Sequence, residues 1–129
     1  MRFLMTALPG SNQPANVPPD PRLMAAMADL TERMTQAGKL VMTGGMDLTG
    51  TRVRLAAGEV AVLDGPYAEA KEVIGGYAIV EAASREEALE MAKEFLELHR
   101  QILGNSYEAD SIVQRLYGPW DADGCVPPQ

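Results

Sequence analysis

Apolar residues recur along the chain with two spacings, one typical of strands and one typical of helices. Short apolar or alternating runs predict strands over residues 3–8, 40–46, 51–55, 60–63, 73–81 and 111–117. Apolar residues three and four positions apart predict two amphipathic helices, which follow the first strand and the fifth strand. The predicted order is therefore strand–helix–strand, a hairpin, and then strand–helix–strand.

Local residues set the expected ends of both helices. Asp20 and Pro21 suit the cap and the first position of the first helix, and Gly38 suits its end. Ser84 with Glu87 three residues later forms a capping-box pattern at the start of the second helix, which we expect to end near Gly104. Glycine pairs at 44–45 and 75–76 predict a disturbed second strand and either a bulge or a close approach in the fifth.

This order of elements predicts an α+β fold of ferredoxin-like topology, in residues 1–117, followed by a Pro/Gly-rich tail over 118–129. One layer of two helices covers only one face of a sheet. The strands nevertheless carry apolar residues for both faces, namely Phe3, Met5, Ala7, Leu40, Met42, Ile112 and Leu116. We therefore expect a homodimer that packs sheet on sheet with C2 symmetry.

Composition narrows the classes of partner. The 129 residues suit one domain, and the net charge of -7 disfavours nucleic acid and anionic membrane as partners. The first apolar run is too short for a signal peptide, no run is long enough to span a membrane, and we expect a cytoplasmic protein. The one cysteine, Cys125, favours a free thiol over an intermolecular disulfide or redox role.

The stretch from Asp64 to Tyr77 reads DGPYAEAKEVIGGY. It resembles the DGPF signature of the YCII-related proteins, with Tyr67 in place of the phenylalanine, and the SREEA start of the second helix is also typical of that family. The resemblance implies a dimeric α+β barrel built from two ferredoxin-like units. It implies little about activity, because most members have no established function.

The resemblance also implies an active-site His/Asp pair in a cleft between sheet, helix and loops. This chain departs from that pattern, because its first helix has no histidine. Its single histidine, His99, borders the apolar face of the second helix near the C-terminal end. We favour a packing or capping role for His99 over acid–base catalysis.

Asp64 is the strongest candidate for a catalytic group. It directly follows a predicted strand, and a carboxylate beside apolar walls can act as a base. We favour a turn role for Asp64, because Asp-Gly-Pro is a strong turn sequence, and the two roles are compatible. Lys71, Arg52 and Arg54 suit an anionic ligand, although we favour a solvated charge cluster for Lys71 and a charged strand surface for the two arginines. Tyr67 and Met46 are candidate wall residues.

The sequence gives little support for metal binding, phosphate binding or nucleophilic catalysis. The eight methionines are predicted to fill the core, no Cys/His set suits a metal, and no phosphate loop or nucleophile motif is present, so we expect no cofactor. The loop over residues 9–20 fits a lid or a surface insertion equally well.

Two functions fit these features. The first is a cofactor-independent enzyme or small-molecule-binding protein with a cleft near Asp64 in each half of a dimer. The second is a noncatalytic regulatory or interaction protein that uses the acidic, unpaired outer face of the second helix. The resemblance implies a link to transcription for the second function, because some family members are encoded beside alternative sigma factors. We favour the first, because the Asp64–Tyr77 stretch concentrates polar groups, glycines and aromatic rings.

Overall fold

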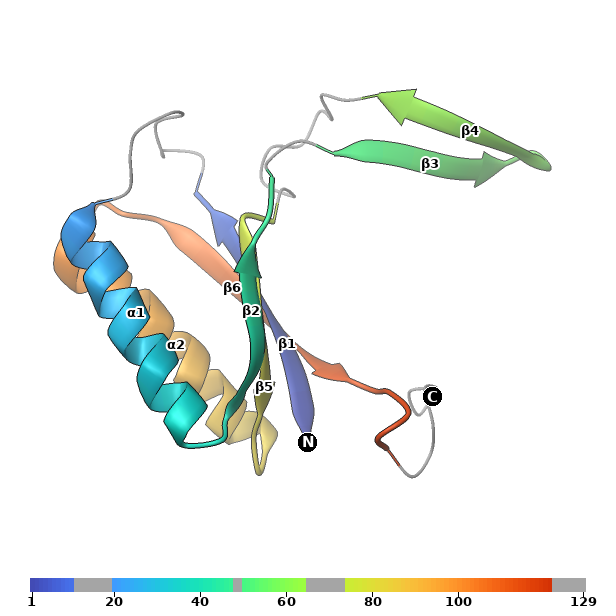
Figure 1. Cartoon of the computed structure of the whole chain (residues 1–129). Coiled ribbons are helices and arrows are strands. Elements are labelled where there is room, and N and C mark those ends of the chain that lie inside the picture. Colours follow the sequence, from blue (N-terminus) through green and yellow to red (C-terminus); the bar gives the residue numbers. More distant parts are fainter. Residues whose placement is uncertain (11–19, 48–49, 65–73, 122–129) are drawn as a thin grey trace.

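The computed structural model describes residues 1–10, 20–47, 50–64 and 74–121, with the backbone alone at residue 64. Figure 1 shows the elements that these residues form. In chain order they are β1 (Arg2–Pro9), α1 (Pro21–Gln36), β2 (Leu40–Gly45), β3 (Thr51–Ala56), β4 (Glu59–Asp64), β5 (Gly76–Glu81), α2 (Arg85–Leu103) and β6 (Ala109–Leu116). The predicted order of strands and helices is confirmed.

The main sheet has four strands in the order β2-β5-β1-β6, and each strand is antiparallel to its neighbours. The β1–α1–β2 unit therefore encloses β5, and the β5–α2–β6 unit encloses β1. Two interleaved units of this kind are the ferredoxin-like arrangement, so the predicted α+β fold class is confirmed. The homodimer stays a prediction.

Both helices lie on one face of this sheet (Figure 1). The core forms between the two layers, where Phe3 and Val80 from the sheet pack with Ala88 and Ala92 of α2. The opposite face carries the alternate side chains of the same strands. Two of them, Met42 and Ile112, are 53% and 47% exposed, so at these described positions the face is open.

The helix ends follow the sequence signals. The Asp20 carboxylate accepts a hydrogen bond from the backbone N–H of Arg22 at 2.8 Å, and the Ser84 hydroxyl accepts one from the N–H of Glu87 at 3.2 Å. Gly38, two residues after α1, has a φ of +72°, the left-handed conformation that glycine adopts readily. The predicted caps and the predicted stop are confirmed.

Of the two glycine pairs, one does not have the structural effect that the sequence predicted. Gly44 and Gly45 pair regularly with β5, and the irregularity in β2 lies instead between Leu40 and Met42. The prediction that Gly44-Gly45 disturbs the strand is wrong, because the extra, unpaired residue of β2 lies between Leu40 and Met42. Close approach explains the second pair: a Cβ on Gly75 would lie 3.3 Å from the Pro9 ring, and β5 starts only at Gly76, with no bulge.

Strands β3 and β4 form a two-stranded sheet of their own, which extends away from the main sheet (Figure 1). Their turn uses Ala57 and Gly58, both with positive φ, which is the geometry of tight hairpins. Val53 lies opposite Val62, and Leu55 lies opposite Val60. These four side chains share one face of the hairpin and are 65–73% exposed.

The methionines divide into two groups. Met5 is buried, and Met34 and Met91 pack against the core, as predicted. Met24 and Met42 are 56% and 53% exposed, so the prediction that they fill the core is wrong. Met24 lies in the first turn of α1, and Met42 lies on the sheet face away from the helices, where it pairs with Ile79. Within the described residues, no helix is long and apolar enough to cross a membrane.

Candidate functional site

A cavity of about 140 Å³ lies between the helices and the main sheet. Helix α1 contributes Met27 and Leu30, α2 contributes Met91 and Phe95, and the strands contribute the floor. The described residues that line it are Met5, Thr6, Ala7, Met27, Leu30, Thr31, Met34, Leu40, Thr43, Gly44, Gly76, Tyr77, Ala78, Val80, Met91, Phe95 and Ser111. Leaving this volume unfilled forgoes roughly 3 kcal/mol of packing, at about 24 cal/mol per Å³.

The chemistry of the lining is apolar with a few hydroxyl groups. Thr31, Thr43 and Ser111 supply them from α1, β2 and β6. The Thr43 hydroxyl donates a hydrogen bond to the Tyr77 carbonyl at 2.9 Å, so its oxygen is left to accept. No lining residue is Asp, Glu, Lys, Arg or His among the residues that the structure describes. A bare ion in this space would lack a counter-charge, and its burial would be costly.

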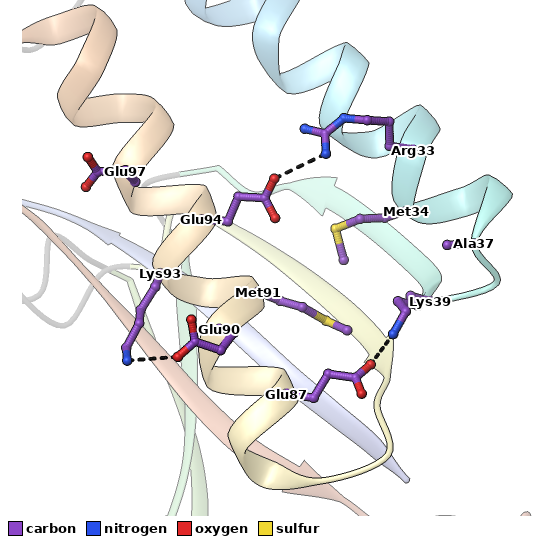
Figure 2. Close-up of a pocket in the computed structure, with 10 residues that line it drawn as sticks. All are labelled: Arg33, Met34, Ala37, Lys39, Glu87, Glu90, Met91, Lys93, Glu94 and Glu97. Atoms are coloured by element: carbon purple, nitrogen blue, oxygen red, sulfur yellow. Dashed lines mark hydrogen bonds and ion pairs between the residues drawn. The ribbon is translucent and has the colours of Figure 1, made fainter.

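A second space, a groove of about 570 Å³, runs along the surface between α1 and α2. Its walls are charged: Arg33 of α1 binds Glu94 of α2 at 3.2 Å, and Lys39 binds Glu87 (Figure 2). The hydrogen bond from Lys39 holds the pKa of the Glu87 carboxyl below its usual value. These two pairs tie α2 to α1 and to the start of β2.

Met34 and Met91 line both the groove and the cavity. Figure 2 shows their side chains extending from α1 and α2 into the space between the helices. Two thioether side chains therefore separate the interior cavity from the charged groove. Methionine is unbranched and has three rotatable bonds, so these two side chains are the adaptable part of the boundary.

His99 has the packing role that its position predicts. Its ring is 9% exposed and lies 4.5 Å from the Phe95 ring and 5.5 Å from the Tyr107 ring, between centroids. Nδ1 is 2.8 Å from the Phe95 carbonyl oxygen, which can only accept, so Nδ1 carries the proton. Burial raises the pKa of the neighbouring Tyr107 phenol. His99 is not among the residues that line the cavity.

The two arginines and Met46 lie apart from the cavity lining. Arg52 and Arg54 lie on the hairpin face opposite Val53, as alternation predicts, and pair in register with Leu63 and Ala61. Met46 is 48% exposed, and its backbone N–H donates to the Gly75 carbonyl at 3.1 Å. Its exposure contradicts the prediction that it fills the core. The structure thus does not bring these three candidates into the cavity wall.

The remaining candidates are described in part or not at all. Asp64 ends β4, where its backbone pairs with Thr51. Tyr67 and Lys71 lie outside the described residues, as do Cys125 and most of the 9–20 loop. Their roles in ligand binding or catalysis stay predictions.

Sequence reasoning missed the residues that line the cavity. The helical spacing of Met27, Leu30 and Met34 indicated a face toward the core, but a void in that core depends on how four elements meet. Thr31, Thr43 and Ser111 gave no signal, because isolated hydroxyl residues are common on helices and strands. The described residues contain no cluster of His, Cys, Asp and Glu suited to a metal ion.

Comparisons with known proteins bear on the family. Residues 1–95 match the model of the YCII-related domain. The chain is 35% identical over 102 residues to an uncharacterised protein of Rhizobium meliloti strain 1021, covering 78% of this chain and 79% of that protein. The chain is also similar to a solved structure, that of 5-chloro-2-hydroxyhydroquinone dehydrochlorinase from Burkholderia phenoliruptrix AC1100 in complex with 2,5-dihydroxybenzoquinone. The two chains are 17% identical in sequence, and the TM-score is 0.48. The match covers 92% of this chain and 95% of the dehydrochlorinase chain.

Proposed function

The chain belongs to the YCII-related family, and on that premise we propose that it binds a small, uncharged, ring-sized molecule in the cavity between helices and sheet. The single observation that carries the proposal is the cavity itself, about 140 Å³ with an apolar lining and three hydroxyl residues. An engineered apolar cavity of about 150 Å³ accepts one benzene ring. The hydroxyls of Thr31, Thr43 and Ser111 favour a ring that carries one or two hydrogen-bonding groups.

The groove supplies a route to this site. Met34 and Met91 form its floor and also line the cavity, so movement of their side chains opens a path for a ligand. The ion pairs of Arg33 with Glu94 and of Lys39 with Glu87 hold the groove walls together while the methionines move.

Any catalysis in this proposal depends on Asp64 as the acid or base. Among the described residues, the cavity lining contains no Asp, Glu, Lys, Arg or His that could act as an acid or a base. The segment after Asp64 rejoins the described chain at Ile74 and reaches the lining at Gly76. Asp64→Asn therefore tests whether Asp64 acts on the ligand. Unchanged ligand binding with lost turnover would support Asp64 as a base. Unchanged turnover would exclude Asp64 from catalysis.

The regulatory alternative has less support from the structure. It depends on an acidic face of α2 that is free for a partner. Four glutamates of α2 already form ion pairs within the chain, namely Glu87 with Lys39, Glu90 with Lys93, Glu94 with Arg33 and Glu97 with Arg100. The interpretation of this helix as unpaired is wrong for these residues.

Binding is tested with three probes, namely benzene, phenol and benzoate, by calorimetric titration and by the shift of the thermal midpoint. We expect benzene and phenol to bind with a millimolar or tighter dissociation constant, and benzoate roughly 100-fold more weakly at pH 7, because its charge would be buried. Ala7→Leu fills the cavity and weakens phenol binding at least about 10-fold.

Ala25→Leu is the matched control, since it adds the same atoms at an exposed position of α1 outside the cavity lining. Far-ultraviolet circular dichroism checks that both variants fold. No binding of phenol by the wild type, or equal binding by Ala7→Leu, would contradict the proposal.

A further inference from the structure

Thr43 is a lining residue of the cavity whose hydroxyl group has a partner in the main sheet. Its hydroxyl donates a hydrogen bond to the Tyr77 carbonyl oxygen at 2.9 Å. A carbonyl oxygen can only accept, so the single hydroxyl proton of Thr43 is committed to this bond. The hydroxyl oxygen keeps its remaining lone pairs, and toward a ligand in the cavity it can therefore only accept a hydrogen bond.

Strand pairing on both sides fixes the position of the Tyr77 carbonyl. Strand β5 lies inside the main sheet, where Tyr77 pairs with Thr6 of β1 and with Gly44 of β2. The Tyr77 ring lies against Gly44, since a Cβ on that glycine would be 3.1 Å from Cε1 of the ring. Threonine is branched at Cβ and has few χ1 rotamers, so this carbonyl holds the Thr43 hydroxyl in one orientation.

Ser111 carries a hydroxyl at the opposite edge of the same cavity. The main sheet has the order β2-β5-β1-β6, so Thr43 and Ser111 lie on its two outer strands. Neighbouring strands are about 4.8 Å apart, which separates the two outer strands by roughly 14 Å. A ligand of one ring therefore reaches one of these two hydroxyls at a time.

We propose that Thr43 determines the specificity of the cavity, and that it selects rings with an N–H or O–H donor over rings that can only accept a hydrogen bond. The inference rests on the proposed binding function and adds which group of the ligand is recognised. A donor on the ligand meets the remaining lone pairs of the Thr43 oxygen. An acceptor at the same place meets an oxygen with no proton to give, so the cost of removing that acceptor from water is not repaid.

The burial of the lining residues indicates how such a ligand lies. Strand β2 is an edge strand and Thr43 is exposed, whereas Leu30 and Val80 are 4% and 0% exposed. The donor group of the ligand therefore points to the β2 edge, and its apolar ring lies against the buried residues. Water competes for the Thr43 oxygen at this edge, so we expect a selectivity that corresponds to one ordinary hydrogen bond.

Pyrrole and furan are the matched probes, because these two five-membered rings differ in one group. Pyrrole has an N–H donor, and furan has an oxygen that can only accept. Calorimetric titration gives both dissociation constants for the wild type and for Thr43→Val, which keeps the branched shape of threonine and removes the hydroxyl. We expect Thr43→Val to weaken pyrrole binding about 3- to 10-fold and to change furan binding by less than about 2-fold.

Two further variants separate this role from a general effect on the cavity. Thr43→Ser keeps the hydroxyl and should keep the wild-type ratio of the two dissociation constants. Ser111→Ala removes a hydroxyl from the opposite edge and should change that ratio by less than about 2-fold. Circular dichroism checks that each variant folds, and valine suits an exposed position of a strand.

The outcomes distinguish this inference from the proposed function. A wild type that binds none of benzene, pyrrole and furan would overturn both. If benzene binds, the role of Thr43 alone is overturned by a wild type that binds furan as tightly as pyrrole. The same holds for an unchanged ratio in Thr43→Val, or for a ratio that is lost in Ser111→Ala.

Discussion

At the scale of single residues, His99 shows how much of a side chain's environment can be predicted from its position in the sequence. Its place seven residues after Ala92 and four after Phe95 predicted a side chain at the edge of the apolar face, and the structure buries it there. Which partners it meets was not predictable, because Tyr107 comes from the loop after α2. The hydroxyls of Thr31, Thr43 and Ser111 were missed for the same reason, since strand register and helix packing bring them together.

Replacing His99 with alanine removes a buried ring and leaves the neighbouring aromatic rings without contact. We expect the free energy of unfolding to fall by about 2–4 kcal/mol in His99→Ala. His99→Phe keeps the ring contacts and loses only the hydrogen bond to the Phe95 carbonyl, so we expect a loss of about 1 kcal/mol. Urea unfolding measures both. A catalytic rather than structural His99 would leave stability unchanged in both variants.

At the scale of elements, the ends of the helices were predictable because caps are local. The residue types at Asp20, Gly38 and Ser84 decide backbone conformation within a turn of themselves. The irregularity in β2 near Val41 was not predictable, because a bulge is defined by the partner strand and not by its own residues. The hairpin was predicted, whereas its separation from the main sheet required the structure.

The cap of α2 offers a direct test at this scale. Ser84→Ala removes the side chain that accepts a hydrogen bond from the Glu87 N–H, and we expect a loss of about 1 kcal/mol in the free energy of unfolding. Ser84→Thr keeps a hydroxyl in the same place and should lose less than half as much. Chemical denaturation followed by circular dichroism measures both changes. Equal losses in the two variants would argue against the cap.

At the scale of the whole molecule, the order of elements in the chain predicted the ferredoxin-like topology, because few arrangements connect two strand–helix–strand units without crossing. The cavity was not predictable from the same pattern. It is a space left where Met27 and Leu30 of α1, Phe95 of α2 and the strands meet. Periodicity shows which residues face inward, and only three-dimensional packing shows how completely they fill the interior.

Ion pairs on the surface make the stability of the folded protein depend on pH, in a direction that the pKa shifts determine. Hydrogen bonds from Arg22, Arg2, Lys39 and Arg100 lower the pKa values of Asp20, Glu81, Glu87 and Glu97 in the folded protein. Their contribution to stability is complete above the ordinary carboxyl values of 3.8 and 4.5 and is lost as the pH falls through the lowered folded values.

We therefore expect the free energy of unfolding to be nearly level between pH 7 and about pH 5, and to fall below about pH 4. Salt at about 1 M should reduce this dependence, because the four carboxylates are exposed or partly exposed and screening acts on them. Denaturation at several pH values with and without salt measures it. A stability that rises on acidification would contradict these pKa directions.

The central claim, a ligand site between helices and sheet, is tested most directly through the eight methionine methyl groups. Met5, Met27, Met34 and Met91 line the cavity, whereas Met1, Met24, Met42 and Met46 do not. In protein labelled with carbon-13 at these methyls, a phenol titration followed by NMR should shift the four lining resonances with one common dissociation constant and leave the other four in place. Unmoved lining resonances, or equal shifts in all eight, would contradict the claim.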